Sequence, residues 1–128
     1  MKLLLDTHSF LWFISGSSRL SSTPRQLIEE ATNQPYLSIA SLWEMAIKMS
    51  LGKLSLTQPF AKLIPEQMRV NGVELLNMSI DHIAKVVDLP FHHRDPFDRL
   101  LIAQALVEQL PIVSADPAFD AYGIERLW

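Results

Sequence analysis

Short apolar runs that alternate with helix-like segments constrain the fold of this chain more than any other feature. A run such as Leu3-Leu4-Leu5, ended by a charged residue, is typical of a strand buried on both faces of a parallel sheet. We predict strands at Lys2 to Leu5, Tyr36 to Ile39, Val73 to Met78 and Pro111 to Ser114, with a fifth at Ile124 to Leu127. Because strands and helices alternate, we expect an α/β fold whose parallel sheet is covered on both faces.

Helices are expected between these strands, and capping residues, prolines and glycines mark their ends. The predicted helices are His8 to Ile14, Ser22 to Ala31, Ser41 to Leu51, Pro59 to Val70, Ser79 to Val87 and Asp95 to Gln109. The residues Phe91 to Arg94 are expected to form a loop. The third and sixth of these helices are apolar on nearly every side, which predicts that both are buried.

Length and composition exclude several classes of protein. The 128 residues, 48% hydrophobic and 20% charged, predict one domain over residues 1–128. The absence of cysteine excludes disulfides and thiolate zinc sites, and it favours a cytoplasmic location. A net charge of −3 provides no global basic field, so nucleic acid would have to bind a local patch. No apolar stretch is long enough for a membrane span, and Asp6 and His8 interrupt any signal-peptide pattern.

Four carboxylates in apolar surroundings are the candidates for chemistry. Asp6 and Asp116 each follow a predicted central strand, at the sheet edge where open α/β folds bind ligands. Glu44 and Asp98 are placed in the first turns of the two apolar helices. Four carboxylates that meet at one edge would repel by about 3 kcal/mol for each pair at ~5 Å. Such a cluster must take up protons or bind a cation.

Each acid also has a purely structural interpretation. Asp6 and Asp95 could cap the helices that follow them, and Asp116 could cap a turn at Pro117. The segment Ser41-Leu42-Trp43-Glu44 matches a capping box. Glu44 and Lys48 are also spaced as an ion pair across one helical turn.

Oxygen ligands without cysteine favour Mg²⁺ or Mn²⁺, and such sites activate water against phosphodiesters. The residues therefore predict a metal-dependent phosphodiesterase or phosphohydrolase. A receiver domain would have adjacent acids after the first strand, and a haloacid-dehalogenase-type phosphatase would have Asp-x-Asp there. This chain has Asp6-Thr7-His8 at that place, so both alternatives fit poorly.

The ordered set of motifs resembles the PIN domain family, specifically the VapC-type toxins of bacterial toxin–antitoxin pairs. The motifs are Leu3 to His8, Ser38 to Lys48, Arg94 to Ala105 and Pro111 to Asp116, followed by Phe119 and Tyr122-Gly123. The resemblance covers nearly the whole chain. It implies a three-layer α/β/α sandwich around a mostly parallel sheet of four to five strands. It also implies an endoribonuclease that depends on Mg²⁺ or Mn²⁺.

The resemblance assigns roles to individual residues. By position, the catalytic metal ligands would be Asp6, Glu44, Asp98 and Asp116. Asp95, Thr7 and Ser114 are expected beside these ligands, where Thr7 or Ser114 would orient the attacking water. The residues considered for binding RNA phosphates are Arg94, Arg99 and Lys48, with salt bridges or a solvated helix face as the alternative. His92-His93 is interpreted as loop or RNA-adjacent surface, and Trp12, Phe13 and Trp43 as core or interface.

The resemblance also implies two partners besides RNA: a small VapB-type antitoxin, and a second copy of the chain in a homodimer. The apolar block Leu11 to Ile14 exceeds what one buried helix face requires, although a helix sandwiched in the core would explain it equally. Two alternative functions stay open. One is a PIN-type RNA-processing nuclease outside any toxin pair, and the other is a non-catalytic PIN-like binding module whose acids only cap helices.

Overall fold

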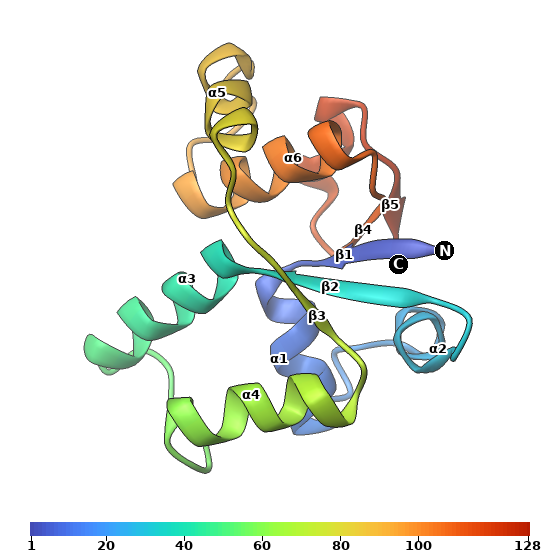
Figure 1. The fold of residues 1–128 in the computed structure, drawn as a ribbon, viewed down its shortest axis with the longest axis vertical. Helices are drawn as coiled ribbons and strands as arrows, with labels where there is room; N and C mark the ends of the chain where they lie inside the picture. Colours follow the sequence, from blue (N-terminus) through green and yellow to red (C-terminus); the bar gives the residue numbers. More distant parts are fainter.

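A five-stranded, entirely parallel sheet forms the centre of the molecule, whose computed structural model describes all 128 residues (Figure 1). The strands are β1 (Lys2–Leu5), β2 (Gln34–Ser38), β3 (Glu74–Leu76), β4 (Ile112–Val113) and β5 (Arg126–Leu127). They are ordered β3-β2-β1-β4-β5, so that β1 lies in the middle. Leu3, Leu4 and Leu5 are completely buried, as expected for a run that is apolar on both faces. Leu5 lies beside both Leu37 and Val113, which aligns the carboxyl ends of the three central strands.

Helices cover both faces of this sheet. They are α1 (Thr7–Ser15), α2 (Ser22–Glu29), α3 (Ile39–Ser50), α4 (Phe60–Val70), α5 (Ile80–Asp88) and α6 (Pro96–Glu108), with a 3₁₀ helix, η1 (Pro117–Tyr122). One hydrophobic cluster joins Leu3 and Leu5 to α1, α2, α3 and α4, whereas the other joins Leu4 to α6 and η1. In Figure 1 α1, α2 and α4 lie below the sheet and α5 and α6 above it. The predicted three-layer α/β/α architecture is confirmed.

The start of α3 differs from the prediction. Ser38 is the N-cap, since its Oγ accepts from the amide of Ala40 at 3.0 Å, and the helix therefore begins at Ile39. Glu44 lies in the second turn, so the predicted capping box at Ser41 was wrong. The helix is also not buried on every side, because Trp43 is 60% exposed. Of the two candidate capping serines, Ser38 caps the helix because β2 ends there, and Ser41 lies inside the first turn.

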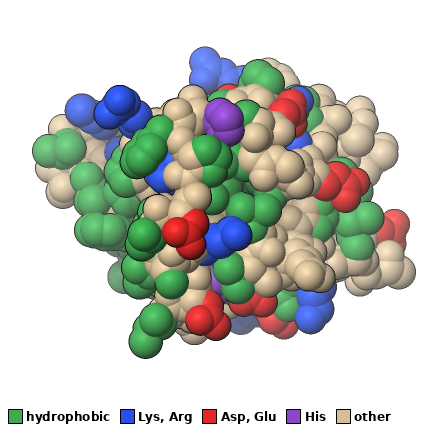
Figure 2. All heavy atoms as spheres, turned by 90° about the horizontal axis from the view of Figure 1, so that it is seen from above, with side chains coloured by type: hydrophobic (Ala, Val, Ile, Leu, Met, Phe, Trp, Pro, Cys, Tyr) green, Lys and Arg blue, Asp and Glu red, His purple; other side chains and the backbone are tan.

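The apolar side chains with the highest exposed fractions lie on α5 rather than on α1. Ile80 is 84% exposed and Val87 is 82% exposed, and Ile83 between them is also exposed. By contrast, Leu11 to Ile14 of α1 are partly buried and pack against the first hydrophobic cluster. Figure 2 shows the face seen from the side of α5, where acidic and basic side chains are interspersed with hydrophobic ones. None of the helices is both long and apolar enough to span a membrane.

Candidate active site at the carboxyl edge of the sheet

Asp6 and Asp116 lie where the two central strands β1 and β4 end. Asp6 is buried and caps α1, since its Oδ1 accepts from the Ser9 amide at 2.7 Å. Asp116 caps η1 by accepting from the Ala118 amide at 2.9 Å. Ser114 joins the two acids: its hydroxyl hydrogen-bonds the Asp6 carboxylate, and its Oγ accepts from the Asp116 amide at 3.0 Å. Burial raises the pKa of Asp6, and the hydrogen bonds from Ser114 and Ser9 oppose this shift in part.

Glu44 approaches the same edge from α3 and is buried. Its Oε1 accepts a hydrogen bond from the Thr7 hydroxyl at 2.7 Å, and its Oε2 lies 2.9 Å from Lys48 Nζ. The Thr7 hydroxyl also lies 2.9 Å from Ser41 Oγ. The predicted ion pair between Glu44 and Lys48 is therefore present. Thr7 follows Asp6 directly, so this hydrogen bond ties the end of β1 to α3.

Asp98 occupies the first turn of α6, as predicted. Asp95 is the N-cap and accepts from the amides of Phe97 at 2.9 Å and Asp98 at 3.1 Å. The pKa of Asp98 is raised to about 7, first by burial and then by the negative charges of Asp95, Glu44, Asp6 and Asp116. The three other predicted ligands, Asp6, Glu44 and Asp116, thus lie within electrostatic reach of Asp98.

The carboxylates share this edge but do not converge on one point. No group of three or more His, Asp or Glu side chains lies close enough to hold a metal ion. The expectation of a compact ligand cluster is therefore not met. The acids around Asp98 are instead engaged within the chain: Asp6, Asp95 and Asp116 cap helices, and Glu44 pairs with Lys48.

Arg99 does not face the acids, which corrects its proposed role in binding phosphate. Its buried guanidinium donates to the carbonyl groups of Pro90 at 2.8 Å, Leu89 at 3.2 Å and Val86 at 3.4 Å. It also stacks 4.1 Å from the ring centre of Phe91. Successive residues of a helix point about 100° apart, so Arg99 points away from the edge that Asp98 faces. Arg94 is exposed and Lys48 half-buried, so both stay candidates for binding phosphate.

Two further features were missed in the sequence. His93 was interpreted as loop or surface, yet its side chain is only 18% exposed and lies between Tyr122 and Asp98. Trp43 and Phe97, each directly before a predicted ligand, form an edge-to-face pair with ring centres 5.5 Å apart. Tyr122 belongs to the ordered motifs and could have indicated a partner near the acids, but a loop sequence does not indicate what it packs against.

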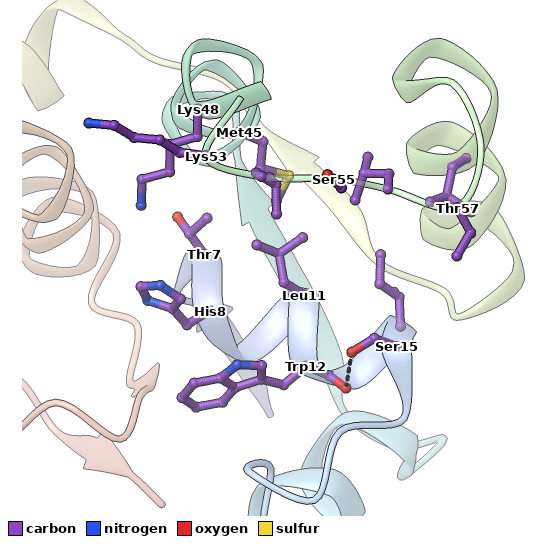
Figure 3. A pocket seen from close by; sticks show the side chains of 14 residues that line it. Thr7, His8, Leu11, Trp12, Ser15, Met45, Lys48, Lys53, Ser55 and Thr57 are labelled. Atoms are coloured by element: carbon purple, nitrogen blue, oxygen red, sulfur yellow. Dashed lines mark hydrogen bonds between the residues drawn. The ribbon is translucent and has the colours of Figure 1, made fainter. Parts of the chain in front are cut away.

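A groove of about 540 Å³ opens beside this edge, between α1 and the segment that links α3 to α4 (Figure 3). Its floor is apolar and includes Leu11, Trp12 and Met45. Thr7, His8, Lys48 and Lys53 line the end that lies nearest to Glu44, and Figure 3 shows the two lysines side by side. The groove therefore combines an apolar floor with positive charge next to the acids.

The fold and the acid edge together define the class of protein. The chain belongs to the PIN domain family, whose family model matches residues 3–125. A curated relative is Ribonuclease VapC16 of Mycobacterium tuberculosis, 41% identical over 58 residues. That match spans 45% of this chain and 40% of the mycobacterial protein, so the chain covers less than half of the relative's length.

Solved structures confirm the fold. VapBC2 from Rickettsia felis, bound to a promoter DNA fragment, superposes with a TM-score of 0.73 at 14% identity, over 98% of this chain and 97% of that chain. A toxin–antitoxin complex from Klebsiella pneumoniae gives a TM-score of 0.60 at 18% identity, over 89% and 86% of the two chains. FitAcB from Neisseria gonorrhoeae gives a TM-score of 0.60 at 16% identity, over 98% of this chain and 96% of that chain. Identities this low establish a shared architecture only.

Proposed function

We propose that this protein is an endoribonuclease that depends on Mg²⁺ or Mn²⁺ and hydrolyses RNA phosphodiesters as the toxin of a VapBC-type pair. One observation carries the proposal: four further acids lie close enough to the partly buried Asp98 that, after burial itself, their charges contribute to raising its pKa to about 7. Capping a helix does not require four further carboxylates within electrostatic reach of Asp98. A divalent cation at this edge would relieve their repulsion.

The donor set fits such an ion. Asp6, Glu44, Asp98 and Asp116 offer only carboxylate oxygens, which are the ligands that Mg²⁺ and Mn²⁺ prefer. When bound, the ion would polarise a phosphate oxygen and activate the attacking water. The chain's own residues position the site: Thr7 holds Glu44, and Ser114 holds Asp6 and the amide of Asp116. The Lys48 ammonium must move away from Glu44 before that carboxylate can bind a cation.

Three basic side chains near the acid edge could bind RNA phosphates. Lys48 and Lys53 lie together at the end of the groove, and Arg94 is exposed four residues before Asp98. Neither Lys53 nor Arg94 forms an ion pair within the chain. With a net charge of −3, this local patch is where a polyanion would approach.

The proposed protein partners also have surfaces to bind. An antitoxin helix would fit the groove, since an apolar face could cover Leu11 and Trp12 while an arginine or lysine reached the acids. For a homodimer, we propose the surface formed by the exposed apolar side chains of α5, which are Ile80, Ile83 and Val87. Light scattering tests the dimer, because a monomer at tens of micromolar would contradict it.

The alternative of a non-catalytic binding module is favoured by one observation: Asp6, Asp95 and Asp116 do cap helices. Purified protein incubated with labelled RNA, with Mg²⁺ or with EDTA, separates the two functions. The nuclease must cleave RNA only with the metal, and a preparation inactive under both conditions would favour the binding module. A short reading frame overlapping the gene upstream would favour the toxin over an RNA-processing nuclease.

A further inference from the structure

We propose that His93 is a positioning residue that orients Asp98, and that Tyr122 holds its imidazole in the required tautomer. This inference rests on the proposed function, because it assigns a role to a residue beside the proposed metal site. His93 belongs to the loop before α6, and Tyr122 ends η1, which begins after Asp116. The pair therefore links the two segments that carry Asp98 and Asp116.

Two hydrogen bonds set the tautomer of His93. Its backbone amide donates to Tyr122 Oη at 3.2 Å, and the same Oη lies 2.7 Å from His93 Nδ1. The hydroxyl accepts from the amide, and in the proposed arrangement it donates its own hydrogen to Nδ1. A ring nitrogen that accepts a hydrogen bond carries no hydrogen, so the neutral imidazole carries its hydrogen on Nε2.

The Nε2 atom of His93 lies close to the proposed ligand Asp98. Nε2 lies 3.5 Å from Asp98 Oδ2, slightly farther than a hydrogen bond. Nε2 is itself buried and has no hydrogen-bond partner. A buried donor without a partner is unfavourable. We therefore infer that Nε2 finds its partner in the nearby Asp98 carboxylate. A shift of about 0.5 Å by the Asp98 carboxylate would complete the hydrogen bond.

The consequence is a fixed orientation for Asp98. With Oδ2 held by Nε2–H, the other carboxylate oxygen remains free to face the acid edge. Residues that hold a metal ligand in this way typically change metal affinity 10- to 100-fold when they are removed. His93 therefore contributes to cation binding without touching the cation.

Three variants test the role. His93→Leu removes the donor, whereas His93→Gln keeps an N–H donor at a comparable reach. His92→Leu is the matched control, since the exposed His92 ring packs edge-on against Tyr122, with centres 4.9 Å apart, in the same loop. Mn²⁺ binding, measured by electron paramagnetic resonance, should weaken about 10- to 100-fold in His93→Leu. Binding should recover in part in His93→Gln and stay unchanged in His92→Leu.

Nuclear magnetic resonance of the metal-free protein tests the geometry separately. The ¹⁵N shifts of His93 should show the Nε2–H tautomer, which Tyr122→Phe should convert to a mixture, and Asp98→Asn should shift the Nε2 resonance. A Nδ1–H tautomer, or a Nε2 resonance insensitive to Asp98→Asn, would overturn the proposal. Wild-type affinity in His93→Leu would overturn it too. A wild-type protein that binds no Mn²⁺ while these resonances behave as expected would overturn the proposed function instead.

Discussion

Lys48 Nζ lies 2.9 Å from Glu44 Oε2 across one turn of α3, while the Thr7 hydroxyl holds Oε1 of the same carboxylate. The chain thus supplies its own cation to one acid of the edge. The lysine is half-exposed and the glutamate buried, so the ammonium can leave towards solvent or towards a phosphate. Metal binding at Glu44 and phosphate binding by Lys48 are therefore both expected to require that the Lys48 ammonium moves away from Glu44.

Replacing Lys48 should have opposite effects on the two ligands. Lys48→Met is expected to tighten Mn²⁺ binding roughly fivefold, because a competing charge worth about 1 kcal/mol is removed. The same variant should bind single-stranded RNA more weakly, and its affinity should depend less on salt, by about 0.7 in the log–log slope. Calorimetry with Mn²⁺ and fluorescence anisotropy with labelled RNA in EDTA measure the two effects. Lys62→Met, on the exposed side of α4, should change neither.

Asp98→Asn should separate catalysis from folding. The variant is expected to lose more than about 100-fold of the ribonuclease activity, since loss of a ligand exceeds the 10- to 100-fold cost of its supporting residues. The metal-free variant should be more stable by about 1 kcal/mol, because it removes a carboxylate that is disfavoured first by burial and then by four neighbouring acids. Activity assays and urea titrations check both. Undiminished cleavage by Asp98→Asn would contradict its assignment as a metal ligand. Asp81→Asn on α5 is the control and should leave cleavage unchanged.

The metal-free protein should lose stability as the pH rises from about 4 to 7. Asp98 has a folded-state pKa of about 7, above its unfolded value of 3.8, so between these values the folded state binds more protons than the unfolded state. The free energy of unfolding therefore falls with rising pH across this window, by up to about 1.4 kcal/mol per unit for this one group. The raised pKa of Asp6 acts in the same direction. Urea titrations at pH 4.5, 5.5 and 6.5 measure the slope, and a rise in stability would contradict the shift.

Arg99 is expected to be essential for stability. Arg99→Met leaves three carbonyl groups without the donor they now share, which should cost about 3 kcal/mol of unfolding free energy. For a chain of this length the melting temperature should fall by roughly 10 °C. Arg94→Met, in the exposed loop, should leave the melting temperature unchanged and weaken RNA binding instead. Equal melting temperatures for the two variants would reject this assignment.

Local patterns predicted the sheet and most of the helix caps. The run Leu3-Leu4-Leu5 is apolar on both faces, which only a covered parallel sheet accommodates, and Asp6, Asp95 and Asp116 cap helices through their nearest amides.

What depends on distant contacts was not predictable. Ser38 and Ser41 are both suitable caps, and only the end of β2 decides between them. The direction of Arg99 and the burial of His93 depend on segments far along the chain, the carbonyl of Val86 and the hydroxyl of Tyr122. The spacing of Glu44 and Lys48 did predict their ion pair, but it did not indicate that the acids would lie too far apart to form a compact metal cluster.

The strand order has a consequence for biosynthesis. Because β1 pairs on one side with β2 and on the other with β4, it must pair with a strand that is synthesised much later. Asp6 meets Ser114, and through it Asp116, only when β4 has docked. A growing chain that ends before β4 therefore carries Asp6, Glu44 and Asp98 but not Asp116, and we expect it to have no nuclease activity. The topology thus delays completion of the acid edge until β4 has been synthesised, and under the proposed function it would keep shorter growing chains from cleaving the messenger that encodes them.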